Sequence, residues 1–134
     1  MNATIEKIRP YALALLRWVT VYLFIWHATA KFWEFPISMT GGNGPVTDPM
    51  MVVGGIVEIV GSILLALGWF TRPAAFILSG QMFVGYFIAH VAYKGNVFMP
   101  LLNGGELALV YAILFFTFFL TGAGACSIDN RKRY

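Results

Sequence analysis

The sequence predicts an all-α fold: a polytopic membrane four-helix bundle, up-down-up-down, forming a single transmembrane domain over residues 1–134. Two observations carry this prediction. Hydrophobic residues make up 59% of the chain and charged residues only 11%, whereas an ordinary soluble domain is about half apolar and about a quarter charged. The apolar residues also gather in four stretches, each close to the roughly 20 residues that a helix needs to cross the hydrocarbon core.

The four stretches place the expected helices at about 11–32, 50–69, 73–93 and 104–121. The only long connection is an outer loop over residues 34–49, in which the run Gly41–Pro45 is typical of turns rather than helix. Pro73 suits the first turn of the third helix, where its missing N–H would be unpaired anyway. Asn103 is the expected N-cap of the fourth helix.

The basic residues indicate how the helices are oriented in the membrane. The net charge is +3, and the basic residues lie at helix ends rather than along one helix face. This distribution indicates the orientation of the helices in the membrane rather than nucleic-acid binding. Lys7, Arg9, Arg72 and the tail Arg131–Arg133 fall on one side, which we expect to be cytoplasmic. Both termini are then cytoplasmic, and the first and third loops lie outside.

The first helix could be mistaken for a cleaved signal peptide, because Ala28-Thr29-Ala30 resembles a cleavage site. Arg17 interrupts the apolar region, however, which argues against a signal peptide. We therefore expect the first helix to be retained.

The two halves of the sequence resemble each other, which predicts an internal repeat. The first helix ends with His27 and Lys31, and the third ends with His90 and Lys94, so that each pair is four residues apart. A Gly-Gly pair and then a glutamate follow in both halves. Two hairpins of the same orientation would be related by a pseudo-twofold axis along the membrane normal.

Ionisable residues within the expected spans are the first candidates for a site, because such groups are expensive in lipid and normally face the bundle interior. Arg17 in the first helix and Glu58 near the middle of the second predict a buried ion pair. Such a pair could fix the helix register, or it could handle protons or anchor a substrate.

A second group of polar residues is expected to cluster in the outer half of the bundle: His27, Lys31, His90, Asn103 and Glu106. Three interpretations stay open. The residues could simply hydrogen-bond one another at the interface, they could form a pocket for a quinone head group or a similar small molecule, or His27 and His90 could ligate a metal or haem. Histidine suits a quinone site because it exchanges a proton near neutral pH. Bis-histidine haem needs both rings aimed into one cavity, so quinone is favoured over haem, and no metal is expected.

Several segments together resemble the DoxX family of small bacterial membrane proteins. They are Arg17, the exit His27…Lys31-Phe32, Gly54 to Glu58, Leu67-Gly68, Thr71 to Ala75, His90, Asn103 to Glu106, and Gly122 to Asp129. The resemblance implies a four-helix protein of the bacterial cytoplasmic (inner) membrane. A related branch resembles the small subunit of thiosulfate:quinone oxidoreductase, and other members are linked to oxidative-stress complexes.

Three functions follow as hypotheses. The first is a component of a quinone-linked or redox-protective membrane system, such as an oxidoreductase subunit, that works with a redox partner protein. The second is a small-solute transporter or permeability protein that uses Arg17 and Glu58 as a midplane site and works as a homo-oligomer. The third is a non-catalytic scaffold or assembly factor. Membrane lipids are expected partners in every case, and nucleic acid is not.

Overall fold

The computed structural model describes residues 2–132, so the last residue of the expected basic tail, Arg133, lies outside the described residues. The helices are α1 (Ala3–Phe24), α2 (Trp26–Trp33), α3 (Pro49–Leu67), α4 (Thr71–Gly85), the π-helix η1 (Tyr86–Val91), α5 (Ala92–Lys94), α6 (Pro100–Asn103) and α7 (Glu106–Thr121). Residues 2–132 contain no strand. The all-α prediction is therefore confirmed.

Three continuous helical stretches are long and apolar enough to cross a membrane: Ala3–Trp33, Pro49–Leu67 and Thr71–Lys94. A fourth apolar helix, α7, has 16 residues and is shorter than the other three stretches. The chain is thus a helical membrane protein with three to four apolar helices.

The helices differ from the predicted ranges at two places. The first helix begins at Ala3 rather than near residue 11, because the Asn2 side chain accepts a hydrogen bond from the Thr4 amide and caps it. The prediction that Asn103 caps the fourth helix was wrong. Asn103 ends the short helix α6, and the N-cap of α7 is Gly105.

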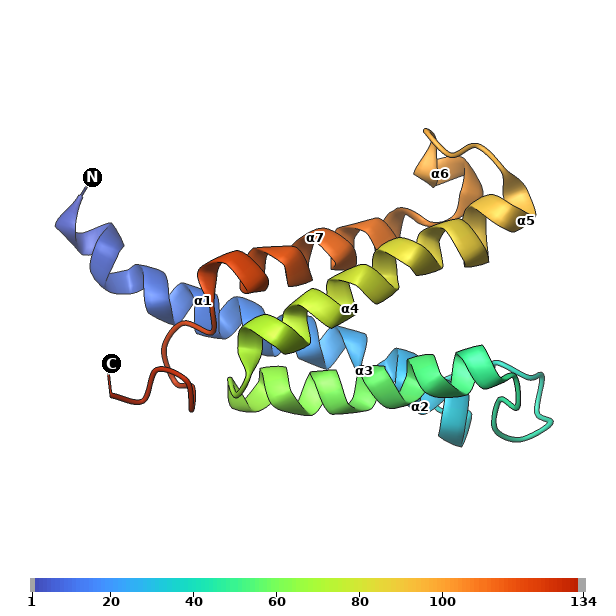
Figure 1. Cartoon of the computed structure of the whole chain (residues 1–134), viewed down its shortest axis with the longest axis horizontal. Helices are drawn as coiled ribbons and strands as arrows, with labels where there is room; N and C mark the ends of the chain where they lie inside the picture. Colours follow the sequence, from blue (N-terminus) through green and yellow to red (C-terminus); the bar gives the residue numbers. More distant parts are fainter. Residues whose placement is uncertain (1, 133–134) are drawn as a thin grey trace.

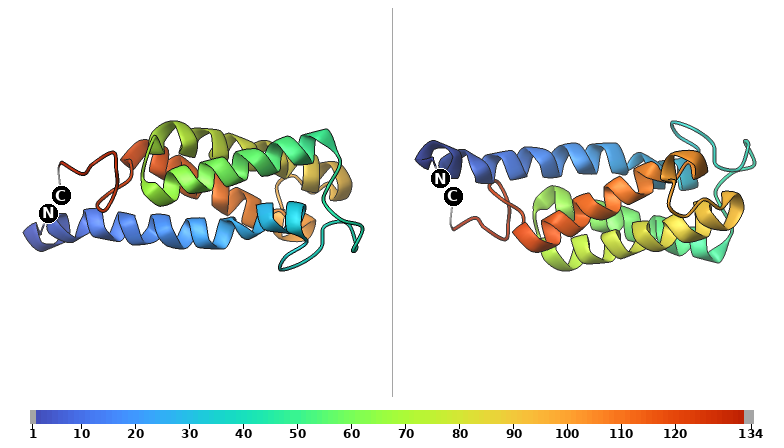
Figure 2. Two further views of the ribbon diagram at one scale, coloured as in Figure 1. Left: turned by 90° about the horizontal axis from the view of Figure 1, so that it is seen from below. Right: turned by 90° about the horizontal axis from the view of Figure 1, so that it is seen from above.

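Consecutive long helices run in opposite directions, and the beginning of α1 and the segment after α7 lie at the same end (Figures 1 and 2). Helix α4 packs along α7, while α3 packs against α1, α2 and α4. Phe24, Leu78 and Phe115 are fully buried between these helices, and the Phe24 and Phe115 rings meet edge to face at 4.8 Å. Many large apolar side chains on the outer faces are exposed, as helices in contact with lipid require.

The C-terminal segment after α7 closes one end of the bundle, and Arg17 holds it there. The fully buried Arg17 donates through Nη1 to the Leu65 carbonyl at 3.2 Å, and through Nη2 to the carbonyls of Ala125 and Cys126 at 3.3 and 2.9 Å. Leu65 lies in the last turn of α3, where the helix dipole favours a cation, and its carbonyl also accepts a hydrogen bond from the Gly68 amide. Arg17 therefore joins α1 to the end of α3 and to the C-terminal segment.

Asp129 adds a second link between the C-terminal segment and the bundle. Its carboxylate accepts hydrogen bonds from the backbone amides of Phe70 and Thr71 at 3.1 and 3.0 Å, at the beginning of α4. These amides belong to a helix N-terminus, where a carboxylate is favourable. The segment is thus an ordered part of the fold rather than a loose tail.

The predicted Arg17–Glu58 ion pair was wrong, and the antiparallel packing of α1 and α3 explains why (Figure 1). Helical side chains lean toward the N-terminus of their own helix. Arg17 therefore leans toward the end closed by the C-terminal segment, while Glu58 leans toward the other end. Arg17 meets α3 at Leu65, seven residues beyond Glu58, which corresponds to about 10 Å along the helix axis.

Candidate ligand-binding cavity

The described part of the chain contains a cavity of about 540 Å³ at the end opposite the C-terminal segment. Its walls come from α2, α3, α4, η1 and α7, and Met39 of the outer loop also contributes. The cavity therefore lies between the pair α2/α3 and the pair α4/α7. Figure 1 shows these two pairs diverging toward this end.

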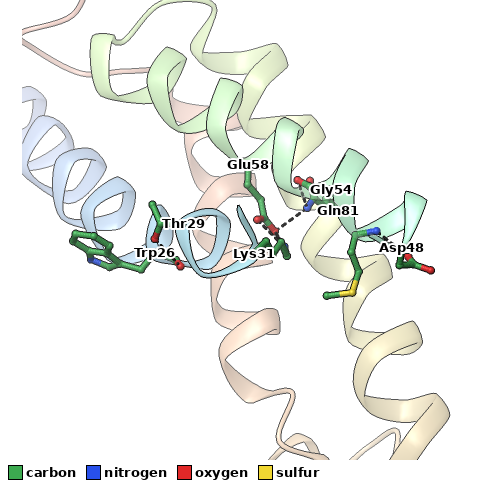
Figure 3. Close-up of polar contacts among 8 residues, drawn as sticks. Trp26, Thr29, Lys31, Asp48, Gly54, Glu58 and Gln81 are labelled. Atoms are coloured by element: carbon green, nitrogen blue, oxygen red, sulfur yellow. Dashed lines mark hydrogen bonds and ion pairs between the residues drawn. The ribbon is translucent and has the colours of Figure 1, made fainter. Parts of the chain in front are cut away.

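The charged group in the cavity is an ion pair between Lys31 and Glu58 (Figure 3). Lys31 Nζ lies 2.6 Å from Glu58 Oε1 and 2.7 Å from Oε2, so the ammonium group bridges both carboxylate oxygens. The Glu58 side chain is 2% exposed and the Lys31 side chain 13%. A pair this buried is held together because either charge alone would be strongly destabilising there.

Gln81 of α4 completes this polar group. Its Nε2 donates to Glu58 Oε1 at 3.0 Å and to the Gly54 carbonyl at 3.1 Å. Both partners are acceptors, which fixes the orientation of the amide. Gln81 Oε1 is buried and has no hydrogen-bond partner within residues 2–132. Three helices therefore contribute one polar side chain each: Lys31 from α2, Glu58 from α3 and Gln81 from α4.

Gly55 allows α2 to approach α3 closely enough for the ion pair to form. A Cβ atom at Gly55 would lie 2.6 Å from a ring carbon of Phe32 and 3.4 Å from Lys31 Cδ. A larger residue would displace the Phe32 ring from α3. The Gly-Gly pair before Glu58 thus has a direct structural use, since small residues let membrane helices pack closely.

The two histidines line the cavity from different sides. His27 of α2 meets the Tyr111 ring edge to face at 5.7 Å. His90 of η1 has its Nδ1 at 3.3 Å from the Asn103 carbonyl oxygen. His90 lies in the π-helix η1, and π-helical turns are frequently found at functional sites.

The remaining walls are largely apolar and adaptable. Four of the chain's six methionines line the cavity: Met39, Met50, Met51 and Met82. Methionine is flexible and polarisable, and it is common at surfaces that accommodate different ligands. The cavity thus combines soft apolar walls with one compact polar group.

The structure brings together three of the five residues expected in the outer cluster: His27, Lys31 and His90. Asn103 is not in the cavity. It is fully buried behind it and donates to the Tyr86 hydroxyl at 2.9 Å. Glu106 is exposed and lines a neighbouring groove of about 410 Å³. Whether any of these residues binds a ligand stays a prediction.

Sequence reasoning missed the partners of Glu58. Lys31 was assigned to the outer cluster, although its side chain leans back along α2 toward Glu58. Gln81 and Tyr111 were not assigned to a site. A polar residue inside an apolar span was the available signal for Gln81, but only the packing of α4 on α3 places it beside Glu58.

The residues of the cavity support a metal site less well than a site for a small organic molecule. Residues 2–132 contain no group of three or more His, Cys, Asp or Glu side chains placed to hold a metal ion. His27 and His90 do line one cavity, so haem ligation by this pair stays a prediction.

The fold and the cavity define a small integral membrane protein whose helices enclose a polar group within an apolar pocket. The chain belongs to the DoxX family, whose family model matches residues 12–91. It is also similar to an uncharacterized protein of Haemophilus influenzae, with 65% identity over 127 residues, which are 95% of this chain and 95% of that protein. No solved structure gives a significant match.

Proposed function

We propose that this DoxX protein is the membrane component of a quinone-linked or redox-protective system, and that its cavity binds a quinone head group or a similar small molecule. The observation that carries the proposal is the Lys31–Glu58–Gln81 group in a largely apolar cavity. Small-molecule sites typically combine apolar walls, a few convergent polar groups and a volume of about 300–1,000 Å³.

The polar group suits a ligand with an apolar body and a polar head. An ammonium group has three N–H donors, and Lys31 directs its short contacts to Glu58 alone. Lys31 therefore keeps donor capacity for a ligand carbonyl, while Glu58 neutralises its charge. A neutral ligand that accepts hydrogen bonds, such as a quinone, fits this arrangement better than an anion.

His27 and Tyr111 add groups that can exchange or donate protons beside the same cavity. Reduction of a quinone to a quinol consumes two electrons and two protons. We propose that a redox partner protein supplies the electrons and that the chain provides the binding site and proton-exchanging side chains. The chain would then be an oxidoreductase subunit rather than a complete enzyme.

We further propose that the protein lies in the bacterial inner membrane with an up-down-up-down topology and both termini in the cytoplasm. The support is that Lys7 and Arg9 lie in the first turns of α1 and Arg72 in the first turn of α4. Figure 1 shows the beginnings of both helices at the end where the C-terminal segment lies, consistent with the positive-inside rule. The cavity then lies in the outer half of the membrane.

Binding of a short-chain ubiquinone analogue to the purified protein in nanodiscs tests the proposal, with quenching of tryptophan fluorescence as the readout. Lys31→Met and the double variant His27→Ala/His90→Ala should weaken binding, and Lys94→Met is the matched control because Lys94 is exposed and does not line the cavity. Mass spectrometry of lipid extracts from protein isolated in native membranes should also find a bound quinone. Unchanged affinity in both cavity variants would refute the proposed site.

No observation favours either alternative over this one. The transporter hypothesis was built on a midplane Arg17–Glu58 site, and these residues bind different partners. The scaffold hypothesis stays a prediction. Unlike the quinone-site proposal, it requires that substitutions in the cavity affect function only by lowering the stability of the protein.

A further inference from the structure

The connection between α5 and α7 is built differently from a loop that faces water. Residues 95–105 contain no charged side chain. Phe98 is 94% exposed and Leu101 79%. Val97, Met99 and Leu102 are exposed as well. Monomeric soluble surfaces rarely expose so many adjacent large apolar side chains, so these residues need an apolar partner.

Several polar groups of the same connection are paired inside the protein, while the Asn96 side chain is exposed. Asn103 is 0% exposed, and its Nδ2 donates to the Tyr86 hydroxyl at 2.9 Å and to the carbonyls of Gly95 and Asn96, each at 3.3 Å. The Tyr86 hydroxyl in turn donates to the Val97 carbonyl at 2.7 Å.

The backbone of the turn between α6 and α7 also finds its hydrogen-bond partners inside the protein. The Gly105 amide donates to Asn103 Oδ1 at 2.8 Å and to the Pro100 carbonyl at 3.2 Å. Gly105 must be glycine here, because an added Cβ would collide with the Tyr86 ring. Non-helical backbone is tolerated at membrane depth where its polar groups are buried in protein. The Gly105 amide and the carbonyls of Gly95, Asn96 and Val97 have partners of this kind, whereas the Val97 and Phe98 amides have none within residues 2–132 and lie at the exposed end of the connection.

Span length gives an independent reason to place this connection in the membrane. Helix α7 has 16 residues, which corresponds to about 24 Å, against a hydrocarbon thickness of about 30 Å. The stretch Thr71–Lys94, by comparison, has 24 residues. Arg72, at the beginning of α4, binds the Phe119 and Leu120 carbonyls, so the two helix ends lie at the same level. The missing length of about 6 Å is then supplied by the residues before Glu106, where α6 exposes Leu101 and Leu102.

We propose that residues 97–103 are embedded in the outer leaflet, where they bind lipid acyl chains and complete the fourth membrane span. The groove lined by Leu101, Glu106 and Val110 lies beside this segment, and its exposed Glu106 carboxylate requires water or lipid head groups there. This groove shares Gly104 and Leu107 with the main cavity. The embedded connection therefore brings the cavity within reach of the outer leaflet, so that a lipid-soluble molecule can enter without crossing water.

Spin-label accessibility in vesicles tests this proposal. The one cysteine, Cys126, is replaced by serine, and single cysteines are introduced by Phe98→Cys and Leu101→Cys, two exposed positions where the label is accommodated. Ile113→Cys, on the lipid-facing side of α7, and Asn43→Cys, in the first outer loop, are the controls. Labels at 98 and 101 should collide with oxygen and exclude a water-soluble nickel chelate, as the label at 113 does.

A second measurement separates lipid from a covering protein. Vesicles of phosphatidylcholine with a nitroxide on the acyl chain should broaden the labels at 98 and 101 in the purified protein. Nickel accessibility at 98 and 101 equal to that at 43 would overturn the proposal. Protection from both oxygen and nickel, with no effect of labelled lipid, would also overturn it by showing that protein covers these residues. The outcome is independent of whether the cavity binds a quinone.

Discussion

Replacement of Lys31 by methionine tests the central polar group of the cavity most directly. The change keeps most of the apolar stem and removes the ammonium group that contacts both Glu58 oxygens. Glu58 is then left with only the Gln81 amide as a side-chain partner, at 2% side-chain exposure. Stranding a buried charge in this way costs about 3–5 kcal/mol.

The opposite variant, Glu58→Gln, should cost less. The Lys31 side chain is 13% exposed, and its long stem can turn the ammonium group toward the cavity, where water reaches it. Loss of a hydrogen-bonded charged partner then costs about 1.5–3 kcal/mol. The double variant Lys31→Met/Glu58→Gln contains no stranded charge and should be more stable than Lys31→Met alone.

The free energy of unfolding, measured in mixed SDS and dodecylmaltoside micelles by tryptophan fluorescence, gives the full double-mutant cycle. Lys94→Met removes an exposed lysine and should stay within about 0.5 kcal/mol of the parent protein. If Lys31→Met were as stable as Lys94→Met, or if adding Glu58→Gln to it restored nothing, the two charges would not be coupled and this account of the site would be wrong.

Three further predictions concern the fold around the cavity and its opposite end. Gly55→Ala should destabilise the protein by about 1–3 kcal/mol in the same assay because the added methyl group overlaps the Phe32 ring, which packs between α2 and α3, whereas Gly80→Ala, where nothing lies within 4 Å, should not destabilise it. Asp129→Ala should cost about 1 kcal/mol through loss of the cap on α4, and protease digestion of the detergent-solubilised protein should then cut the C-terminal segment faster; an unchanged cleavage rate would contradict this role. In the loop over residues 34–48, the Ser38 hydroxyl donates to the Glu34 carboxylate and holds the pKa of Glu34 below its ordinary value of 4.5. This hydrogen bond therefore stabilises the loop at any pH above the pKa that Glu34 has in the unfolded chain. The stabilisation is lost as the pH falls through the lower pKa that Glu34 has in the folded protein. Ser38→Ala should raise the pKa of Glu34 in an NMR titration, and an unaltered titration curve would show that the hydrogen bond is not formed in solution.

The sequence alone determined the class of protein and most of the helical segments. Long apolar runs separated by Gly, Pro and charged residues leave few alternatives, because unpaired backbone groups cannot be exposed to lipid. It also identified which residues needed a partner, since Arg17 and Glu58 cannot face hydrocarbon. His27, Lys31 and His90 were placed in one cluster because helical spacing and depth can be read from residue numbers.

Only the tertiary structure decided which residues are partners. Arg17 binds backbone carbonyls at the end of α3 and in the C-terminal segment. Every residue has a backbone carbonyl, so the sequence does not indicate which of them a charged side chain will bind. Lys31 reaches Glu58 because the two side chains lean toward each other on antiparallel helices, and Gly55 lets those helices approach. Asn103 was expected to cap a helix in the outer cluster, yet it is buried behind the cavity where it binds Tyr86. Spacing along one helix follows from the sequence, but the relative depth and rotation of two helices depend on packing contacts made between distant parts of the chain.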